Sequence, residues 1–293
     1  MRNRLLALVA ATTTAILLAG CSGTSASSER SSPDGSSAIT VPESITQKGA
    51  IDVGVYFNYP PYTFEKDGKL QGIEADLMRA VAGKLGVTAT FHDLAFEAMI
   101  PSVINGRMDA LIGPMGDSAE RQQEVTFIDT LRSRMQAVVK KDNPTGFDIA
   151  SPCGAKNGEV AASTNLRTVT ELSDKCVASG KPAIDTLTLP DNGNVFQAII
   201  TDRTQFSVQD PALAKYMVDT TPDLELQGDS IPAAGGDLQG WIVAKDNDEL
   251  RDAIVAAINE LIADGTWGKI MDAGGLGDAA LDHPLVNGKE PTN

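Results

Sequence analysis

Short apolar segments that read as strands alternate with amphipathic segments that read as helices along most of this chain of 293 residues. The first strand pattern is an apolar alternation of Ile51, Val53 and Val55. Residues 74–85 follow with apolar side chains at helical spacing, and Gly86 stands where a helix C-cap is expected. This alternation predicts an α/β fold with a mostly parallel sheet.

The same pattern continues to residue 263 without an internal repeat of fixed period. The strongest helix is predicted over Asp248–Ala263, with Asp246 as its N-cap and Gly265 at its end. At about 100–200 residues per domain, the length suits two domains. Further strands are predicted at 87–91, 108–113, 135–140, 159–162, 205–209 and 241–244, and further helices at 96–105, 166–172 and 194–201.

The first twenty residues have the composition of an export signal. Arg2 and Arg4 precede an uncharged apolar run, which is shorter than the roughly 18–20 residues of a membrane span. The run ends in Leu18-Ala19-Gly20-Cys21, which resembles the bacterial lipobox. We therefore expect residues 1–20 to be a signal peptide and Cys21 to be lipidated, with an ordinary secretory signal as the alternative. Two or more acyl chains would anchor the protein to the outer face of the cell membrane.

Residues 21–44 are expected to be the lipidated cysteine and a flexible tether, because the segment is rich in Ser and poor in large apolar residues.

Composition narrows the possible partners and cofactors. A formal net charge of −15 argues against a nucleic-acid partner, since that needs a basic face. His92 and His283 are the only histidines, which leaves little material for a His-rich metal site. We expect no metal and no cofactor.

The expected export determines how the three cysteines are interpreted. If Cys21 carries lipid, Cys153 and Cys176 remain as a pair in an oxidising compartment, where a disulfide is the default. Two free buried thiols are the alternative. No C-x-x-C motif is present, and neither histidine is placed by the sequence to activate a thiol.

Five segments between residues 50 and 272 carry a family resemblance. They are residues 68–77 (GKLQGIEADL), 100–101 with 105–110 (IP, NGRMDA), 120–122 with 127–129 (ERQ, FID), 206–210 (FSVQD) and 263–267 (ADGTW). In this order and spacing they resemble the extracellular solute-binding proteins of bacterial ABC importers, in the polar amino-acid class called family 3. The resemblance implies a two-lobed, type II periplasmic-binding-protein-like fold with an interlobe cleft. Lobe 1 would be residues 45–131 plus 240–293, and lobe 2 residues 135–236.

The resemblance also implies a function. Such a protein captures a free amino acid in the cleft and, as a monomer, delivers it to an ABC permease in the cytoplasmic membrane, with no catalytic residue. Closure on the ligand is a hinge motion, for which Gly235 and Gly236 lie near the second crossing between the lobes. Two alternatives stay open: a ligand-sensing lipoprotein without transport, and a cyclohexadienyl-dehydratase-like enzyme on the same fold. Glu74 is the one acid/base candidate for such an enzyme.

The ends of an amino acid suggest one group of binding residues. By resemblance, Arg121 would bind the ligand carboxylate in fork geometry, assisted by the backbone N–H groups of Gly116 and Asn165. Asp210 and the carbonyl of Pro114 would accept hydrogen bonds from the ligand ammonium. The alternatives are a solvated surface arginine and an aspartate that only caps a helix.

The ligand side chain suggests a second group. Tyr59 and Phe96 match an aromatic pair that encloses this side chain, and Thr164 matches a polar position of the second lobe. Glu74 is either a cleft acid or a charge in the first turn of a helix. Tyr56 stands where binders of basic amino acids carry an Asp. We therefore expect a neutral or moderately apolar amino acid, although Glu74 keeps a basic one possible. The order of the tail after residue 277 is left open.

Overall fold

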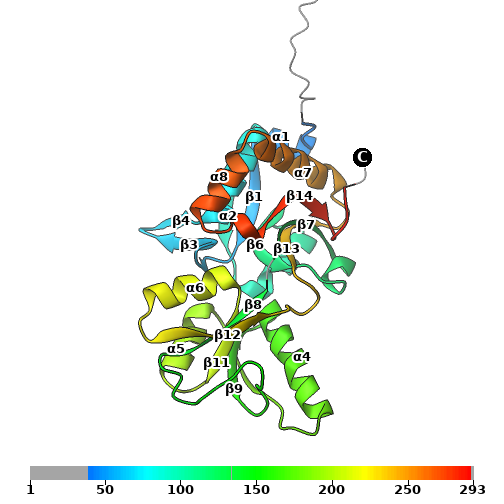
Figure 1. Cartoon of the computed structure of the whole chain (residues 1–293). Coiled ribbons are helices and arrows are strands. Elements are labelled where there is room, and N and C mark those ends of the chain that lie inside the picture. Colours follow the sequence, from blue (N-terminus) through cyan, green and yellow to red (C-terminus); the bar gives the residue numbers. More distant parts are fainter. Residues whose placement is uncertain (1–38, 133, 292–293) are drawn as a thin grey trace, which may run out of the picture. The chain divides into compact units, whose positions relative to one another are not determined.

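A computed structural model of the chain describes residues 39–132 and 134–291 (Figure 1). The part from Ile39 on is one compact unit. The expected signal peptide, Cys21 and most of the expected tether lie outside the described residues. Within the described ranges, no helix has both the length and the apolar character to cross a membrane.

One six-stranded sheet has the order β14-β7-β13-β6-β1-β5. β1 pairs in parallel with β5 and β6, whereas β13 runs antiparallel to β6 and β7, and β14 antiparallel to β7. We call this sheet, with the helices packed on it, lobe 1. Its strands are β1 (Ala50–Val55), β5 (Thr88–Asp93), β6 (Ala110–Gly116), β7 (Val125–Arg132), β13 (Leu238–Ala244) and β14 (Ala280–Val286).

Helices cover both faces of the lobe 1 sheet. Side chains of α2 (Ile73–Lys84), α7 (Asp248–Ala263) and α8 (Thr266–Ala273) share one apolar core with β1. The short α3 (Met99–Ile104), which follows the turn η1 (Phe96–Ala98), packs with β7 on the other face. The remaining elements are α1 (Glu43–Lys48), η2 (Arg121–Gln123), η3 (Gly277–Ala279) and the small sheet of β2 (Asn58–Tyr59), β3 (Thr63–Lys66) and β4 (Lys69–Gln71).

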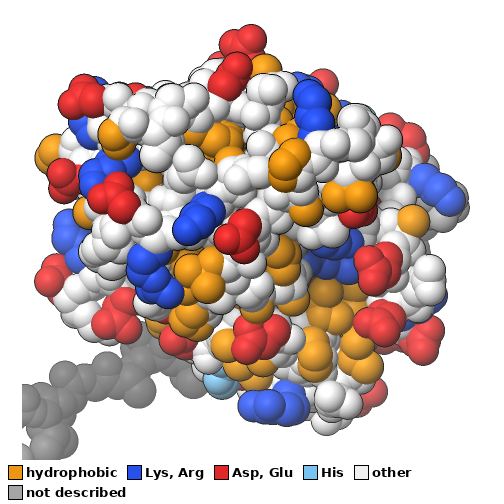
Figure 2. Space-filling model, turned by 90° about the horizontal axis from the view of Figure 1, so that it is seen from below, with side chains coloured by type: hydrophobic (Ala, Val, Ile, Leu, Met, Phe, Trp, Pro, Cys, Tyr) orange, Lys and Arg blue, Asp and Glu red, His pale blue; other side chains and the backbone are white. Residues whose placement is uncertain are grey.

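A second, five-stranded sheet has the order β10-β9-β11-β8-β12, and we call it lobe 2 with its helices. Here α4 packs on one face, and α5 and α6 pack on the other. Its elements are β8 (Met135–Lys140), β9 (Lys156–Val160), α4 (Thr164–Ala178), β10 (Asp185–Leu189), α5 (Asn192–Ile200), β11 (Phe206–Gln209), α6 (Pro211–Thr220) and β12 (Leu224–Ile231). Figure 2 shows a face of the molecule on which Lys and Arg side chains lie scattered among Asp and Glu.

Three expectations from the sequence need correction. The sheets are mixed rather than mostly parallel: β8 runs antiparallel to β11 and β12, and β13 runs antiparallel to β6 and β7. Asn247, not Asp246, caps α7: its Oδ1 accepts a hydrogen bond from the Leu250 N–H at 3.3 Å. The segment after residue 277, whose order was left open, contains β14, which pairs with β7.

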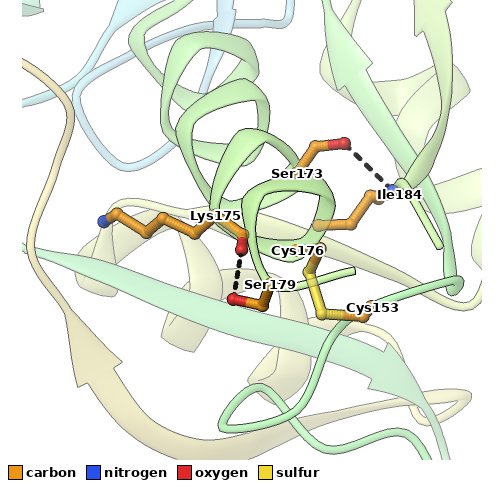
Figure 3. Close-up of a disulfide and its surroundings, with 6 residues drawn as sticks. All are labelled: Cys153, Ser173, Lys175, Cys176, Ser179 and Ile184. Atoms are coloured by element: carbon orange, nitrogen blue, oxygen red, sulfur yellow. Dashed lines mark hydrogen bonds between the residues drawn. A yellow bond between two sulfur atoms is a disulfide. The ribbon is translucent and has the colours of Figure 1, made fainter. Parts of the chain in front are cut away.

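The expected disulfide is confirmed. Cys153, in the loop before β9, is bonded to Cys176 in α4, with 5.5 Å between the two Cα atoms and a sequence separation of 23 (Figure 3). The same helix holds the chain that leads to β10, since Ser173 Oγ accepts a hydrogen bond from the Ile184 N–H at 3.0 Å. The bridge and this bond tie the segments that lead into β9 and β10 to α4.

Candidate functional site

A pocket lies between the two lobes and is lined from both. It contains about 590 Å³ of empty space, part of it open to solvent. Six residues predicted as ligand contacts line it: Tyr59, Phe96, Pro114, Gly116, Thr164 and Asn165. The other three, Glu74, Arg121 and Asp210, are buried but do not line it.

Arg121 bridges the lobes at one edge of the pocket. Its Nη1 donates to the Gly116 carbonyl at 2.8 Å in lobe 1 and to Thr164 Oγ1 at 3.2 Å in lobe 2. Its Nη2 donates to the Ala162 carbonyl at 3.0 Å. Burial, and secondarily the charge of Arg167, lowers the pKa of Arg121 to about 10, so the guanidinium stays charged at neutral pH. The alternative of a solvated surface arginine is wrong, since the residue is only 9% exposed.

The glycine at position 116 follows from this packing. An ideal Cβ on Gly116 would come within 2.5 Å of Thr164 Oγ1. A serine or threonine here would have to displace Thr164 and so disturb one of the two acceptors of Arg121 Nη1. The close approach of the two lobes at this point therefore requires a residue without a side chain.

Asp210 is buried at the end of β11 and the beginning of α6. It caps α6, because its Oδ1 accepts a hydrogen bond from the Ala212 N–H at 2.9 Å. The same oxygen accepts a hydrogen bond from the Tyr62 hydroxyl, which belongs to lobe 1. Burial raises the pKa of Tyr62, which keeps this hydroxyl protonated as a donor. Tyr62 in turn stacks on the pocket residue Tyr59, with ring centroids 5.4 Å apart.

Glu74 lies in the first turn of α2 and is held from two sides. Its Oε2 accepts a hydrogen bond from Trp241 Nε1, and the carboxyl group also accepts one from the backbone N–H of Gly113, which lines the pocket. Burial raises its pKa to about 7, and these two hydrogen bonds oppose the rise. Glu74 therefore supports the pocket wall rather than facing the pocket.

Other lobe contacts were not predicted as part of the site. The hydroxyl oxygen of Tyr56 accepts a hydrogen bond from the Asn192 N–H at 3.1 Å, and Asn192 Nδ2 donates to the Asn58 carbonyl at 3.1 Å. Tyr56 also meets Phe96 edge to face, with ring centroids 6.0 Å apart. Only Tyr56 had a sequence signal, as a departure from the family pattern. Asn192 had none, because its partners are more than a hundred residues away in the chain.

The sequence and fold match known proteins. The family described as "Bacterial extracellular solute-binding proteins, family 3" matches residues 51–273. The chain belongs to this family. The solute-binding protein is 28% identical to the arginine-binding protein ArgT of Corynebacterium glutamicum over 98% of this chain and 96% of that one. It is 28% identical to the L-cystine-binding protein TcyJ of Escherichia coli over 76% and 81%. A solved structure of an ancestral arginine-binding protein bound to glutamine is 31% identical, with a TM-score of 0.68, over 78% of this chain and 98% of that one.

Proposed function

We propose that this solute-binding protein captures a free amino acid between its lobes and delivers it to an ABC permease. The observation that carries the proposal is that two buried groups of opposite charge, Arg121 and Asp210, lie behind a pocket whose described lining residues carry no charge. Asp210 accepts a hydrogen bond from Tyr62, which stacks on the lining residue Tyr59. Arg121 forms no ion pair among the described residues, and its guanidinium lies at the edge where Gly116 and Thr164 meet. The zwitterion of an amino acid has a carboxylate that complements this cation and an ammonium that complements Asp210.

The proposed contacts divide the ligand into three parts. The carboxylate would bind Arg121 and the backbone N–H groups of Gly116 and Asn165, and Thr164 would complete that end. The ammonium would bind Asp210 and the carbonyl of Pro114.

Tyr59 and Phe96 would enclose the ligand side chain. Of the described residues that line the pocket, none is Asp, Glu, Lys or Arg. A guanidinium or ammonium placed there would lose water without gaining a carboxylate. Glu74 does not supply one, because its carboxyl group is occupied by Trp241 and Gly113 behind the wall. The proposed ligand is therefore neutral or moderately apolar, even though arginine is named in two of the relatives compared above.

The proposed setting is extracytoplasmic. Residues 1–20 would be removed, lipid on Cys21 would anchor the protein to the outer face of the membrane, and residues 21–44 would tether it. Lobe 1 would comprise residues 45–131 plus 240–293 and lobe 2 residues 135–236, in a monomer. No enzymatic step is proposed, since the carboxyl group of the one acid/base candidate, Glu74, accepts hydrogen bonds from Trp241 and Gly113 behind the pocket wall. Sensing without import would be recognised by ligand binding in cells that show no binding-protein-dependent uptake.

The test is thermal unfolding of residues 22–293 with each of the twenty amino acids at millimolar concentration. A ligand at a thousand times its Kd adds about 4 kcal/mol of stability. Neutral amino acids should give the largest rise. A larger rise with arginine or lysine would overturn the neutral ligand, and no rise on a ligand-free, cooperatively unfolding sample would overturn amino-acid capture.

Arg121→Ala tests the proposed carboxylate contact. Loss of one partner of a buried charge pair costs about 2–5 kcal/mol, so Kd should rise at least about thirtyfold. Arg203→Ala is the matched control, because Arg203 is exposed and does not line the pocket. Equal affinity in the two variants would remove Arg121 from the site.

A further inference from the structure

A line of buried polar side chains leads from the pocket into lobe 2. Asn165 lines the pocket at the start of α4, and its Nδ2 donates to Gln209 Oε1 at 3.0 Å. Gln209 Nε2 donates to Ser207 Oγ at 2.6 Å, and Ser207 Oγ donates to Glu159 Oε1 at 3.1 Å. Ser207, Gln209 and Glu159 are fully buried, and Asn165 is only 7% exposed. Every donor in this line points away from the pocket and towards Glu159.

The direction of the line is set at its inner end. Glu159 Oε1 also accepts hydrogen bonds from the Val208 N–H at 2.7 Å and from Asn157 Nδ2 at 3.0 Å. A backbone N–H can only donate, so the atom opposite Val208 must be an acceptor. Burial raises the pKa of Glu159 to about 8, yet a carboxyl group that holds its proton on Oε2 still accepts through Oε1. Oε1 therefore stays an acceptor in both protonation states.

An acceptor at that position fixes each hydrogen bond in turn. The Ser207 hydroxyl has one hydrogen, which goes to Glu159, so Ser207 can only accept from the next group, the amide nitrogen of Gln209. The amide oxygen of Gln209 then faces Asn165 and requires the amide nitrogen of Asn165. Rotating the Asn165 amide by half a turn would place two oxygens against each other in a buried site, which is costly.

We propose that Glu159 is a positioning residue of the ligand site. Through Ser207 and Gln209 it holds the Asn165 amide in one of its two orientations, and so decides which polar atoms Asn165 presents to the pocket. This inference rests on the proposed function for its effect on a ligand, but the orientation itself is a property of the protein alone. Glu159 contacts no ligand itself and acts only through Ser207, Gln209 and Asn165.

Two variants break the line and one keeps it. Ser207→Ala removes the hydroxyl that relays the direction, and Glu159→Leu removes the acceptor at its end. Glu159→Gln preserves an amide oxygen opposite the Val208 N–H and should preserve the line. Val139→Ala is the control for a general weakening of lobe 2, because Val139 is buried in β8 opposite Phe206 and takes no part in the line.

The first readout is Kd by calorimetry, on residues 22–293, with L-glutamine, L-methionine and L-arginine as probes. For a probe that the unmodified protein binds, Ser207→Ala and Glu159→Leu should raise Kd about three- to tenfold, the effect of one hydrogen bond. Glu159→Gln and Val139→Ala should leave it within about twofold by the same reasoning. A rise in Val139→Ala equal to that in Ser207→Ala would overturn the proposal, because a loss of stability alone would then explain both.

The second readout needs no ligand. Hydrogen exchange of the Asn165 side-chain amide, followed by ¹⁵N NMR, should be slow in the unmodified protein, in Glu159→Gln and in Val139→Ala. It should be at least about tenfold faster in Ser207→Ala, since a broken buried hydrogen bond opens the amide to solvent. Equal exchange in all four proteins would overturn the proposal.

If no probe binds, that result counts against the proposed function, whereas the exchange rates still decide the orientation of the Asn165 amide. If Glu159→Leu does not fold, Ser207→Ala supplies both measurements.

Discussion

Glu74 makes the stability of the folded protein depend on pH in a way that one substitution isolates. Burial raises its pKa from an ordinary value of 4.5 to about 7. Between these two pH values the folded state holds a proton that the unfolded state has released. The free energy of unfolding therefore falls as the pH rises from 4.5 to about 7, and is constant below and above that window with respect to this group. At about 1.4 kcal/mol for each pH unit, the contribution lost is about 3 kcal/mol.

The assay compares urea unfolding of the unmodified protein and Glu74→Gln between about pH 4 and about pH 8, a range that brackets the window. Burial also raises the pKa of Asp129 to about 7 and of Glu159 to about 8, so the unmodified protein alone reports all three groups. Subtracting the unfolding free energy of one protein from that of the other cancels the contributions of Asp129 and Glu159. Whatever the substitution costs in packing against Trp241 is the same at each pH, so only the slope of the difference matters.

The unfolding free energy of Glu74→Gln minus that of the unmodified protein should increase by about 3 kcal/mol as the pH rises across this range. Glu65→Gln is the control for removing a carboxyl group from the surface, because Glu65 is exposed on β3. A Glu74→Gln curve that changes by less than about 1 kcal/mol would refute the reasoning, since the carboxyl group would then be solvated or paired as well in the folded state as in water.

Three further variants test the disulfide and two hydrogen bonds between the lobes. Replacing Cys153 and Cys176 together by Ser should lower the free energy of urea unfolding by about 3 kcal/mol, because the disulfide closes a loop with a sequence separation of 23. The ligand Kd should stay unchanged, because neither cysteine lines the pocket. Tyr62→Phe should lower thermal stability by about 1–3 kcal/mol, because the buried Asp210 loses a donor, and an unchanged melting temperature would contradict this. Arg167→Ala should weaken ligand binding only about twofold, because the 3.3 Å ion pair of Arg167 with the exposed Glu120 is screened by water. A larger loss that persists at high salt would contradict this and would point to the hydrogen bond from Arg167 to Ser118 of lobe 1.

The segments predicted best are those whose signals are local. The strands Ala50–Val55 and Met135–Lys140 and the helix Asp248–Ala263 have the predicted bounds, because apolar period and flanking residues define them without help from the rest of the chain. β7 gave no such signal. Seven of its eight residues are buried, so the alternation that marks a half-exposed strand is missing. β14 contains Pro284, and proline is largely confined to edge strands, which is where the structure places β14.

The same distinction applies to the site. The family motifs led to six residues that line the pocket, because the motifs encode a local backbone shape as well as a side chain. They did not show that Arg121 is engaged by carbonyl groups of both lobes or that Glu74 supports the wall, because those partners lie up to 167 residues away in the chain.

The line from Asn165 to Glu159 is the extreme case. The sequence predicts a strand at 159–162, but nothing local distinguishes the glutamate at its start from an ordinary surface charge. Its burial is possible only because β11 places Ser207 and the Val208 N–H beside it, 48 and 49 residues later. A buried polar group is specified by the partners that satisfy it, and these partners are adjacent only once the sheet has formed. Position 159 therefore acquires its proposed influence on the pocket from strand pairing, which no local pattern in the sequence encodes.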